Sequence, residues 1–182
     1  TKVYHELKTI LRARGISVAV GDEGGFAPTI NALGVFSKER VVLGLLMEAV
    51  GALGLQDKVK ICLDVAASEF FDGSRGSYVV DGELLSFVEL VDQYKKLTKE
   101  YPICSIEDGL DQDDWTGWEH LTKSLGGDIQ LVGDDLFVTQ ENRLKLGAMK
   151  NIANAVIIKP NQVGTISEAV DAVRFAKKNG MA

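Results

Sequence analysis

The sequence lacks several features that would assign a protein to a broad functional class at once. No apolar stretch approaches the roughly 20 residues that a membrane-spanning helix needs, and no secretory signal opens the chain. The formal net charge is −6, and Lys and Arg form no cluster of the kind that follows a phosphate backbone. We therefore expect a soluble protein without a membrane or a nucleic-acid partner.

Cysteine is scarce as well. Cys62 and Cys104 both lie inside apolar runs, and they form neither a CxxC pair nor a metal-ligand spacing. This usage predicts two reduced thiols in the core and favours a cytoplasmic protein, because disulfide-rich frameworks belong to oxidising compartments.

Hydrophobic residues, by contrast, are abundant, at 46% of 182 residues, and they can form a real core. Their spacing predicts two N-terminal helices, over residues 1–14 and 37–53. After these, short β-rich runs alternate with helical patterns. The predicted strands are 59–64, 103–108, 129–135 and 155–160, and the predicted helices are about 83–100, 113–125 and 140–149, with a last helix from a Thr165–Glu168 capping box to Gly180.

Strands that alternate with helices indicate a parallel sheet and an α/β fold. A doubly wound sheet and a (β/α)8 barrel both satisfy the pattern. No GxGxxG or Walker A loop follows any strand, so the nucleotide-binding version of the doubly wound fold loses its usual support. We therefore favour a TIM-type (β/α)8 barrel that is incomplete in this chain, since a whole barrel needs about 250 residues.

Each predicted strand ends in an ionisable residue. These residues are Asp64, Glu107, Asp134 and Lys159. The carboxyl ends of barrel strands form the reaction face, so side chains distant in sequence converge there. A single acid after a strand is most often the N-cap of the next helix, and a single lysine is most often a surface residue. Four coincident strand ends favour a functional site.

Three carboxylates at one edge repel one another, and a shared divalent cation is the simplest way to stabilise them. Oxygen ligands without histidine or thiolate suggest Mg²⁺ or Mn²⁺ rather than zinc. A further acid, Glu23, lies in the segment GDEGGFAP, whose glycines permit a tight placement of a carboxyl group against a ligand. A plain glycine-rich turn explains that segment about equally well.

At these positions the sequence resembles the catalytic barrel domain of the enolase family. The resemblance covers essentially the whole chain and rests on five segments in this order: GDEGGFAP, LDVAASEFF, YPICSIEDGLDQDDW, LVGDDLFVT and IIKPNQVGT. It implies that Glu23 is a proton donor that helps to expel the substrate hydroxyl, and that Lys159 abstracts the α-proton. It also implies metal ligation by Asp64, Glu107 and Asp134.

The resemblance further implies two Mg²⁺ ions and the reversible dehydration of 2-phosphoglycerate to phosphoenolpyruvate. The substrate would lie against Glu107, Asp134 and Lys159. The segment 66–76 would be a mobile loop over the site, and the full-length protein would be a homodimer or a higher homo-oligomer. The positive charge of the cations has a physical role, because removal of an α-proton builds a second negative charge on the substrate carboxylate.

By the same resemblance, residues 1–182 are a partial C-terminal barrel domain, without the N-terminal capping domain and the last barrel strands. We therefore expect a fragment with little or no activity alone. Two alternatives stay open: another superfamily member, such as a racemase or an acid-sugar dehydratase, and a non-catalytic binding protein that keeps only the fold. The segments GDEGG and AASEFF argue against the first, and the intact strand-end residues argue against the second.

Overall fold

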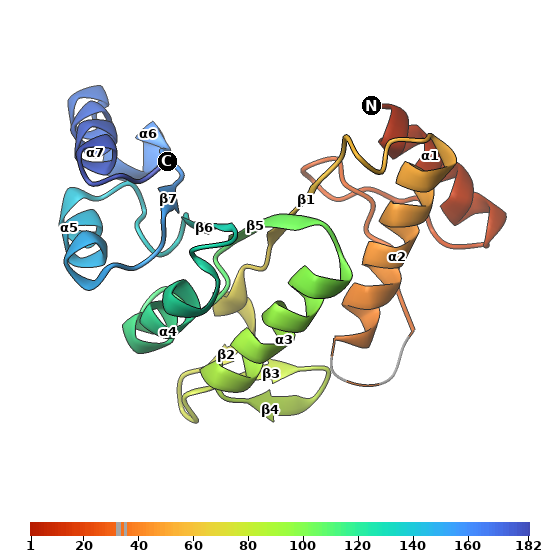
Figure 1. Ribbon diagram of the computed structural model, residues 1–182, viewed down its shortest axis with the longest axis horizontal. Coiled ribbons are helices and arrows are strands. Elements are labelled where there is room, and N and C mark those ends of the chain that lie inside the picture. Colours follow the sequence, from red (N-terminus) through yellow and green to blue (C-terminus); the bar gives the residue numbers. More distant parts are fainter. Residues whose placement is uncertain (32–33, 35) are drawn as a thin grey trace. The chain divides into compact units, whose positions relative to one another are not determined.

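The computed structural model describes residues 1–31, 34 and 36–182, which form two compact units, Thr1–Val59 and Lys60–Ala182. In the first unit, helices α1 (Lys2–Ala13) and α2 (Ser37–Ala52) pack against each other (Figure 1). Their buried side chains are Leu11, Leu43, Leu45, Ala49 and Val50. An ion pair between Arg14 and Glu48, 2.6 Å long, joins the two helices at the surface.

The second unit is built on a parallel sheet of four strands in the order β1–β5–β6–β7. The strands are β1 (Ile61–Asp64), β5 (Ile103–Glu107), β6 (Gln130–Gly133) and β7 (Ala155–Val156). The helices that follow them in the chain are α3 (Phe87–Glu100), α4 (Trp115–Leu125), α5 (Glu141–Lys150) and α7 (Ile166–Lys178). This βα order confirms the predicted α/β fold with parallel strands.

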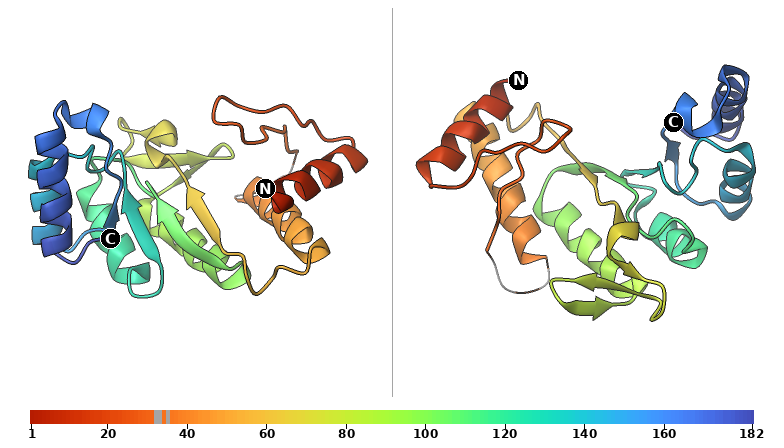
Figure 2. Two further views of the ribbon diagram at one scale, coloured as in Figure 1. Left: turned by 90° about the horizontal axis from the view of Figure 1, so that it is seen from above. Right: turned by 180° about the vertical axis from the view of Figure 1, so that it is seen from behind.

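The helices cover one face of the sheet, as Figures 1 and 2 show. Ile106 and Leu131 point from the strands into this layer and are fully buried, together with Leu90, Trp118 and Leu121 of the helices. Each fully buried apolar side chain of this size stabilises the fold by roughly 1.5–3 kcal/mol. The described strands form a sheet that does not close on itself, in agreement with an incomplete barrel.

Between β1 and α3 the chain forms a small antiparallel sheet, where the resemblance implied a mobile loop over 66–76 and the spacing of apolar residues predicted a helix from about residue 83. It contains β2 (Phe71–Asp72), β3 (Ser77–Val80) and β4 (Glu83–Leu85), preceded by a 3₁₀ turn at Ala67–Phe70. Tyr78 of β3 is fully buried, donates to Asp114 Oδ2 at 2.8 Å and accepts from the Asp111 N–H at 3.0 Å. Burial raises the pKa of Tyr78 above its ordinary range.

The start of α3 corrects the predicted helix over 83–100. The helix begins only at Phe87, because Ser86 and Glu89 form a capping box, and Glu83–Leu85 pairs with β3 instead. The bonds from Ser86 also lower the pKa of Glu89. Strand β7 is likewise shorter than predicted, since Pro160 occupies the first position of the short helix α6 (Pro160–Val163) and carries no N–H for a ladder.

The cysteines are free, as predicted, but they are not core residues. Cys62 is exposed, Cys104 is half-buried, and their sulfur atoms lie 3.8 Å apart. Cys62 alternates with Asp64 onto one face of β1, and the described helices lie on the other face. The apolar run at β1 predicted that both faces of the strand are buried. In the structure, the described residues cover only one of these faces.

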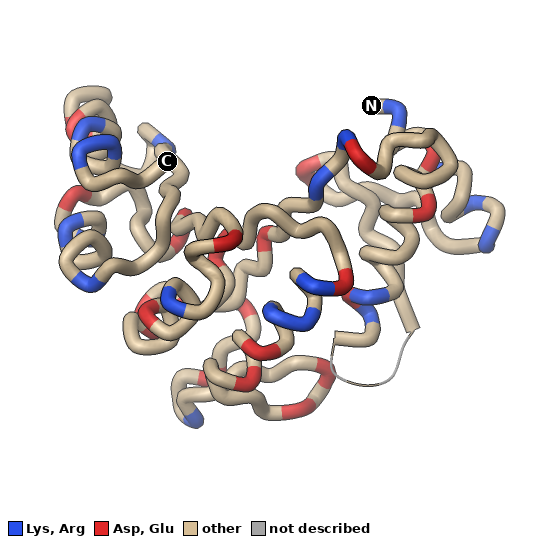
Figure 3. The backbone as a smooth tube through the Cα atoms, in the orientation of Figure 1, with Lys and Arg blue, Asp and Glu red and all other residues tan. Residues whose placement is uncertain are grey.

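No helix within the described ranges combines the length and the apolar character that a bilayer crossing demands. Lys and Arg residues are spread over the helices and loops and do not gather on one element (Figure 3).

Candidate active site

Two carboxylates meet at the ends of β1 and β5. Asp64 and Glu107 are direct partners in the parallel register, so their side chains emerge from neighbouring positions of the sheet. Glu107 is half-buried, and its pKa is raised to about 7, first by loss of solvent and then by the charges of Asp64, Asp108 and Asp134. The crowding that the sequence predicted is therefore present at this edge.

An acid and a base meet at the ends of β6 and β7. Asp134 is buried, at 6% exposure, and its Oδ2 atom forms an ion pair with Lys159 Nζ. The Lys159 side chain stays 45% exposed. The hydrogen bond to Asp134 raises the pKa of Lys159, so the lysine is an ammonium in this arrangement.

Asp108 links the acids at the ends of β1 and β5 to the pair at the ends of β6 and β7. The sequence did not predict Asp108 as a site residue. Its buried carboxylate accepts the backbone N–H groups of Asp134 and Asp135 at 3.1 and 2.9 Å. Burial raises the pKa of Asp108 to about 6, although these bonds oppose the shift. The sequence could have indicated Asp108 through the acidic doublets Glu107–Asp108 and Asp134–Asp135. Neighbouring residues point in different directions, so the second acid of a doublet can bond to the backbone while the first faces the site.

The carboxylates form two overlapping groups that could hold a metal ion, each with ligand oxygens within 4.8 Å of one another. The groups are Asp64, Glu107 and Asp108, and Asp108, Asp134 and Asp135. A set of oxygen donors from carboxylates suits a hard divalent cation. The predicted ligands Asp64, Glu107 and Asp134 thus lie in the two groups, with Asp108 shared between them.

Glu23 lies in the first unit, on a tight turn. The Gly21 N–H donates to the Gly25 carbonyl at 2.9 Å, and Val20 bridges to Phe26, which closes the turn around the exposed Asp22 and Glu23. Gly24 has a φ of +81°, which favours glycine at this position. The other four predicted site residues belong to the second unit, and the role of Glu23 stays a prediction from the sequence.

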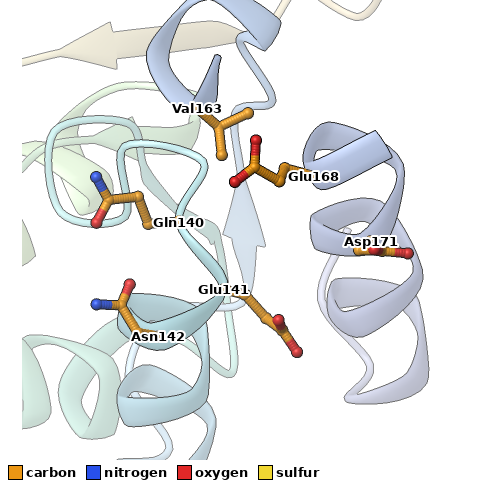
Figure 4. Close-up of a pocket in the computed structure, with 6 residues that line it drawn as sticks. All are labelled: Gln140, Glu141, Asn142, Val163, Glu168 and Asp171. Carbon is orange, nitrogen blue, oxygen red and sulfur yellow. The ribbon is translucent and has the colours of Figure 1, made fainter. Parts of the chain in front are cut away.

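A pocket lies beside α5 and α7, and it has several acidic side chains (Figure 4). The lining residues are Gln140, Glu141, Asn142, Val163, Glu168 and Asp171. Each of its carboxylates has a partner nearby in the chain: Glu141 pairs with Lys145, Glu168 accepts from Thr165, and Asp171 pairs with Arg174. These local bonds explain the acids as helix-end and surface residues, so the pocket adds no second charged site.

Comparison with known proteins connects this geometry to one family. Residues 1–182 match the family described as "Enolase, C-terminal TIM barrel domain". The chain is 48% identical to the enolase of Campylobacter lari over 178 residues, and 48% identical to that of Elusimicrobium minutum over 182 residues. It is 44% identical to the enolase of Natranaerobius thermophilus over 181 residues.

The alignments cover 98–100% of this chain and 41% of the length of each relative. The chain therefore spans about two fifths of the curated relatives that it matches. The description of the matched domain as a TIM barrel also agrees with the βα order of the second unit. The chain belongs to the enolase family and corresponds to sequence of its C-terminal TIM barrel domain.

Proposed function

We propose that this chain carries the metal-binding acids and the acid–base pair of an enolase, a hydro-lyase that interconverts 2-phosphoglycerate and phosphoenolpyruvate. The observation that supports this most directly is the meeting of four ionisable groups from four parallel strands at one edge. Asp64 faces Glu107 there, and Asp134 pairs with Lys159. The printed names of the relatives agree with the proposal.

Asp64, Glu107 and Asp134 would hold Mg²⁺, with two ions in the complete site. The donor set fits, because the acids supply oxygen ligands and the pKa of Glu107 is raised first by loss of solvent and then by the neighbouring acids, whose charges a cation would offset. When bound, the cations would supply positive charge beside the substrate carboxylate, where negative charge develops.

Lys159 takes the α-proton of 2-phosphoglycerate on its Nζ atom. A base must be neutral, whereas the bond to Asp134 favours the ammonium form. A cation held by Asp134 would remove this stabilisation, and its positive charge would lower the pKa of Lys159 toward neutrality. Glu23 acts in the opposite sense and donates a proton to the leaving hydroxyl.

The test uses the gene product that contains this sequence. With Mg²⁺ present, exchange of the 2-phosphoglycerate α-proton with deuterated solvent is followed by proton NMR, and phosphoenolpyruvate formation is followed by ultraviolet absorbance. We expect both activities, and we expect chelation of the metal to abolish both. Failure to exchange the α-proton in saturating Mg²⁺ would contradict the proposal.

The 182-residue chain by itself should have little or no such activity. Calorimetric titration of this chain with Mg²⁺ should show weak binding at most, because the chain spans only two fifths of its relatives' length. Micromolar affinity would show that the described acids suffice for tight binding without further residues.

A further inference from the structure

Asp134 and Lys159 are joined by a second connection besides their ion pair. It runs through Thr139, after β6, and Gln162, on α6. The Lys159 N–H donates to Thr139 Oγ1 at 2.8 Å, the Thr139 hydroxyl donates to Gln162 Oε1 at 2.9 Å, and Gln162 Nε2 donates to Asp134 Oδ1 at 3.0 Å. The two connections together close a ring.

The direction of these bonds is fixed by charge. The carboxylate of Asp134 accepts only, so the amide of Gln162 has to present its NH₂ group to Asp134 and its oxygen to Thr139. The hydroxyl of Thr139 then has to donate to Gln162 and is left to accept from the Lys159 N–H. Each group in the path has one role, and a flipped amide would place two acceptors against each other.

The backbone is strained where Thr139 enters the ring. Val138 and Thr139 have φ values of +42° and +57°, and β-branched residues rarely adopt this region. Thr139 is nevertheless fully buried, with both functions of its hydroxyl satisfied. Strain of this kind persists only where surrounding interactions hold it, and it is concentrated at functional sites.

The two connections differ in what happens during the proposed reaction. The ion pair between Asp134 and Lys159 has to open, since Asp134 is needed by a cation and Lys159 has to be neutral. The path through Thr139 and Gln162 is uncharged, attaches to the other oxygen of Asp134 and to the backbone of Lys159, and involves neither Nζ nor Oδ2. It can therefore persist when the ion pair opens.

We propose that Gln162 and Thr139 are positioning residues that keep the metal ligand Asp134 and the base Lys159 in register while their ion pair is open. This inference rests on the proposed function, because it assumes that Asp134 binds a divalent cation. It adds two residues that act through Asp134 and Lys159 and do not themselves react.

The test compares matched variants of the gene product that contains this sequence, with Mn²⁺ as the probe and its free concentration measured by electron paramagnetic resonance. Gln162→Met keeps the length of the side chain and removes both bonds, and Thr139→Val keeps the shape and removes the hydroxyl. Each should weaken Mn²⁺ binding about tenfold, the scale typical for partners of metal ligands. Thr139→Ser restores the hydroxyl and should restore binding.

Asn161→Ala, at an exposed neighbour on α6, is the control and should bind like the wild type. Thermal unfolding of each variant identifies any that does not fold. Gln162 is only half-buried, whereas Thr139 is fully buried, so Gln162→Met should disturb folding less than Thr139→Val. Affinities of Gln162→Met and Thr139→Val within twofold of the wild type would overturn the positioning role. So would a Thr139→Ser variant as weak as Thr139→Val.

Failure of the proposed function has a separate signature. If Asp134→Asn leaves Mn²⁺ binding unchanged, Asp134 is not a ligand, and both the proposed function and this inference are wrong. If Asp134→Asn weakens binding but the Gln162 and Thr139 variants do not, only the positioning role is wrong.

Discussion

The two sides of the strand-end cluster differ in how their charges are balanced. On the β1–β5 side, Asp64 and Glu107 are direct neighbours of the same sign, and the pKa of Glu107 is raised to about 7. On the β6–β7 side, Asp134 is neutralised by Lys159 and accepts a further bond from Gln162.

Asp134 has a cationic partner in Lys159, whereas the acids around Glu107 raise the pKa of that carboxyl group. An added cation near Glu107 would offset this repulsion. Asp134 belongs to one of the two carboxylate groups, with Asp108 and Asp135, as well as to the ion pair with Lys159. Under the proposed function, a cation held by that group would withdraw Asp134 from Lys159, and metal binding and release of Lys159 would then be coupled through one side chain.

The largest expected effect comes from removing Lys159, the proposed base, on the β6–β7 side. Lys159→Ala in the gene product should slow exchange of the substrate α-proton by at least about 100-fold, since a positioned general base contributes roughly 10²–10⁴-fold. Mg²⁺ binding should stay nearly intact, because the three acids are kept. Proton NMR measures the exchange, and Lys145→Ala, a surface lysine on α5, is the control. Undiminished exchange would remove Lys159 from this role.

The next effect concerns the residue that joins the two sides. Asp108→Ala should lower the free energy of unfolding by about 2–4 kcal/mol, because two buried N–H groups lose a charged acceptor. Asp108→Asn should recover part of this loss, since it keeps one acceptor and asparagine tolerates the φ of +42° at this position. Urea unfolding measures both. Equal stability of the two variants would show that the bonds to Asp134 and Asp135 matter little.

A third pair of variants contrasts the two sides directly. Asp64→Asn should weaken Mn²⁺ binding at least about tenfold, and in chelator it should lower the free energy of unfolding less than Asp134→Asn does, since it also removes the repulsion from Glu107. Asp134→Asn should weaken binding similarly but lower the free energy of unfolding by about 1 kcal/mol, because Lys159 loses its partner. Thermal unfolding with and without Mn²⁺ measures both terms. The contrast fails if Asp64→Asn lowers the free energy of unfolding as much as Asp134→Asn does.

The smallest effect is a dependence of the free energy of unfolding on pH, caused by Glu107 on the β1–β5 side. The folded pKa of Glu107, about 7, lies above the ordinary value near 4.3, so folding favours its protonated form. Its contribution to stability is complete below about pH 4 and is lost as the pH rises through 7. After allowance for solvent screening we expect about 1 kcal/mol, or about 2–4 °C in melting temperature, between pH 5 and 8 in chelator. In Glu107→Gln this component should disappear, and an unchanged profile would contradict the assignment.

Much of this arrangement could be predicted from the sequence, because it depends on local patterns. The βα alternation predicted the parallel sheet, and the ends of the apolar runs predicted where Asp64, Glu107, Asp134 and Lys159 emerge. Of the predicted Thr165–Glu168 capping box, the N-cap bond is present, since the Thr165 hydroxyl accepts from the Glu168 N–H, and the Glu168 carboxylate bonds to the Thr165 hydroxyl. Strand ends and caps are encoded in a few adjacent residues.

The parts that were missed depend on residues distant in sequence. Asp108 bonds across to the next strand, and Thr139 meets Gln162 only after a helix and a further strand have formed. The segment 83–86 has a helical spacing of apolar residues, but pairing with β3 overrides that preference. Cys62 was misplaced because an apolar strand does not reveal how many of its faces are covered.

The anchoring of Tyr78 has a consequence for motion. The enolase resemblance implies that the segment 66–76 moves over the site, and this segment contains β2, the first strand of the small antiparallel sheet. Tyr78 fastens the middle strand of that sheet to Asp111 and to Asp114, the N-cap of α4. A displacement of β3 would break two buried hydrogen bonds, whereas rotation within the exposed turn at 73–76 breaks neither. If the segment moves as the resemblance implies, we therefore expect the motion to be confined to the exposed turn before β3, because Tyr78 holds β3 in place.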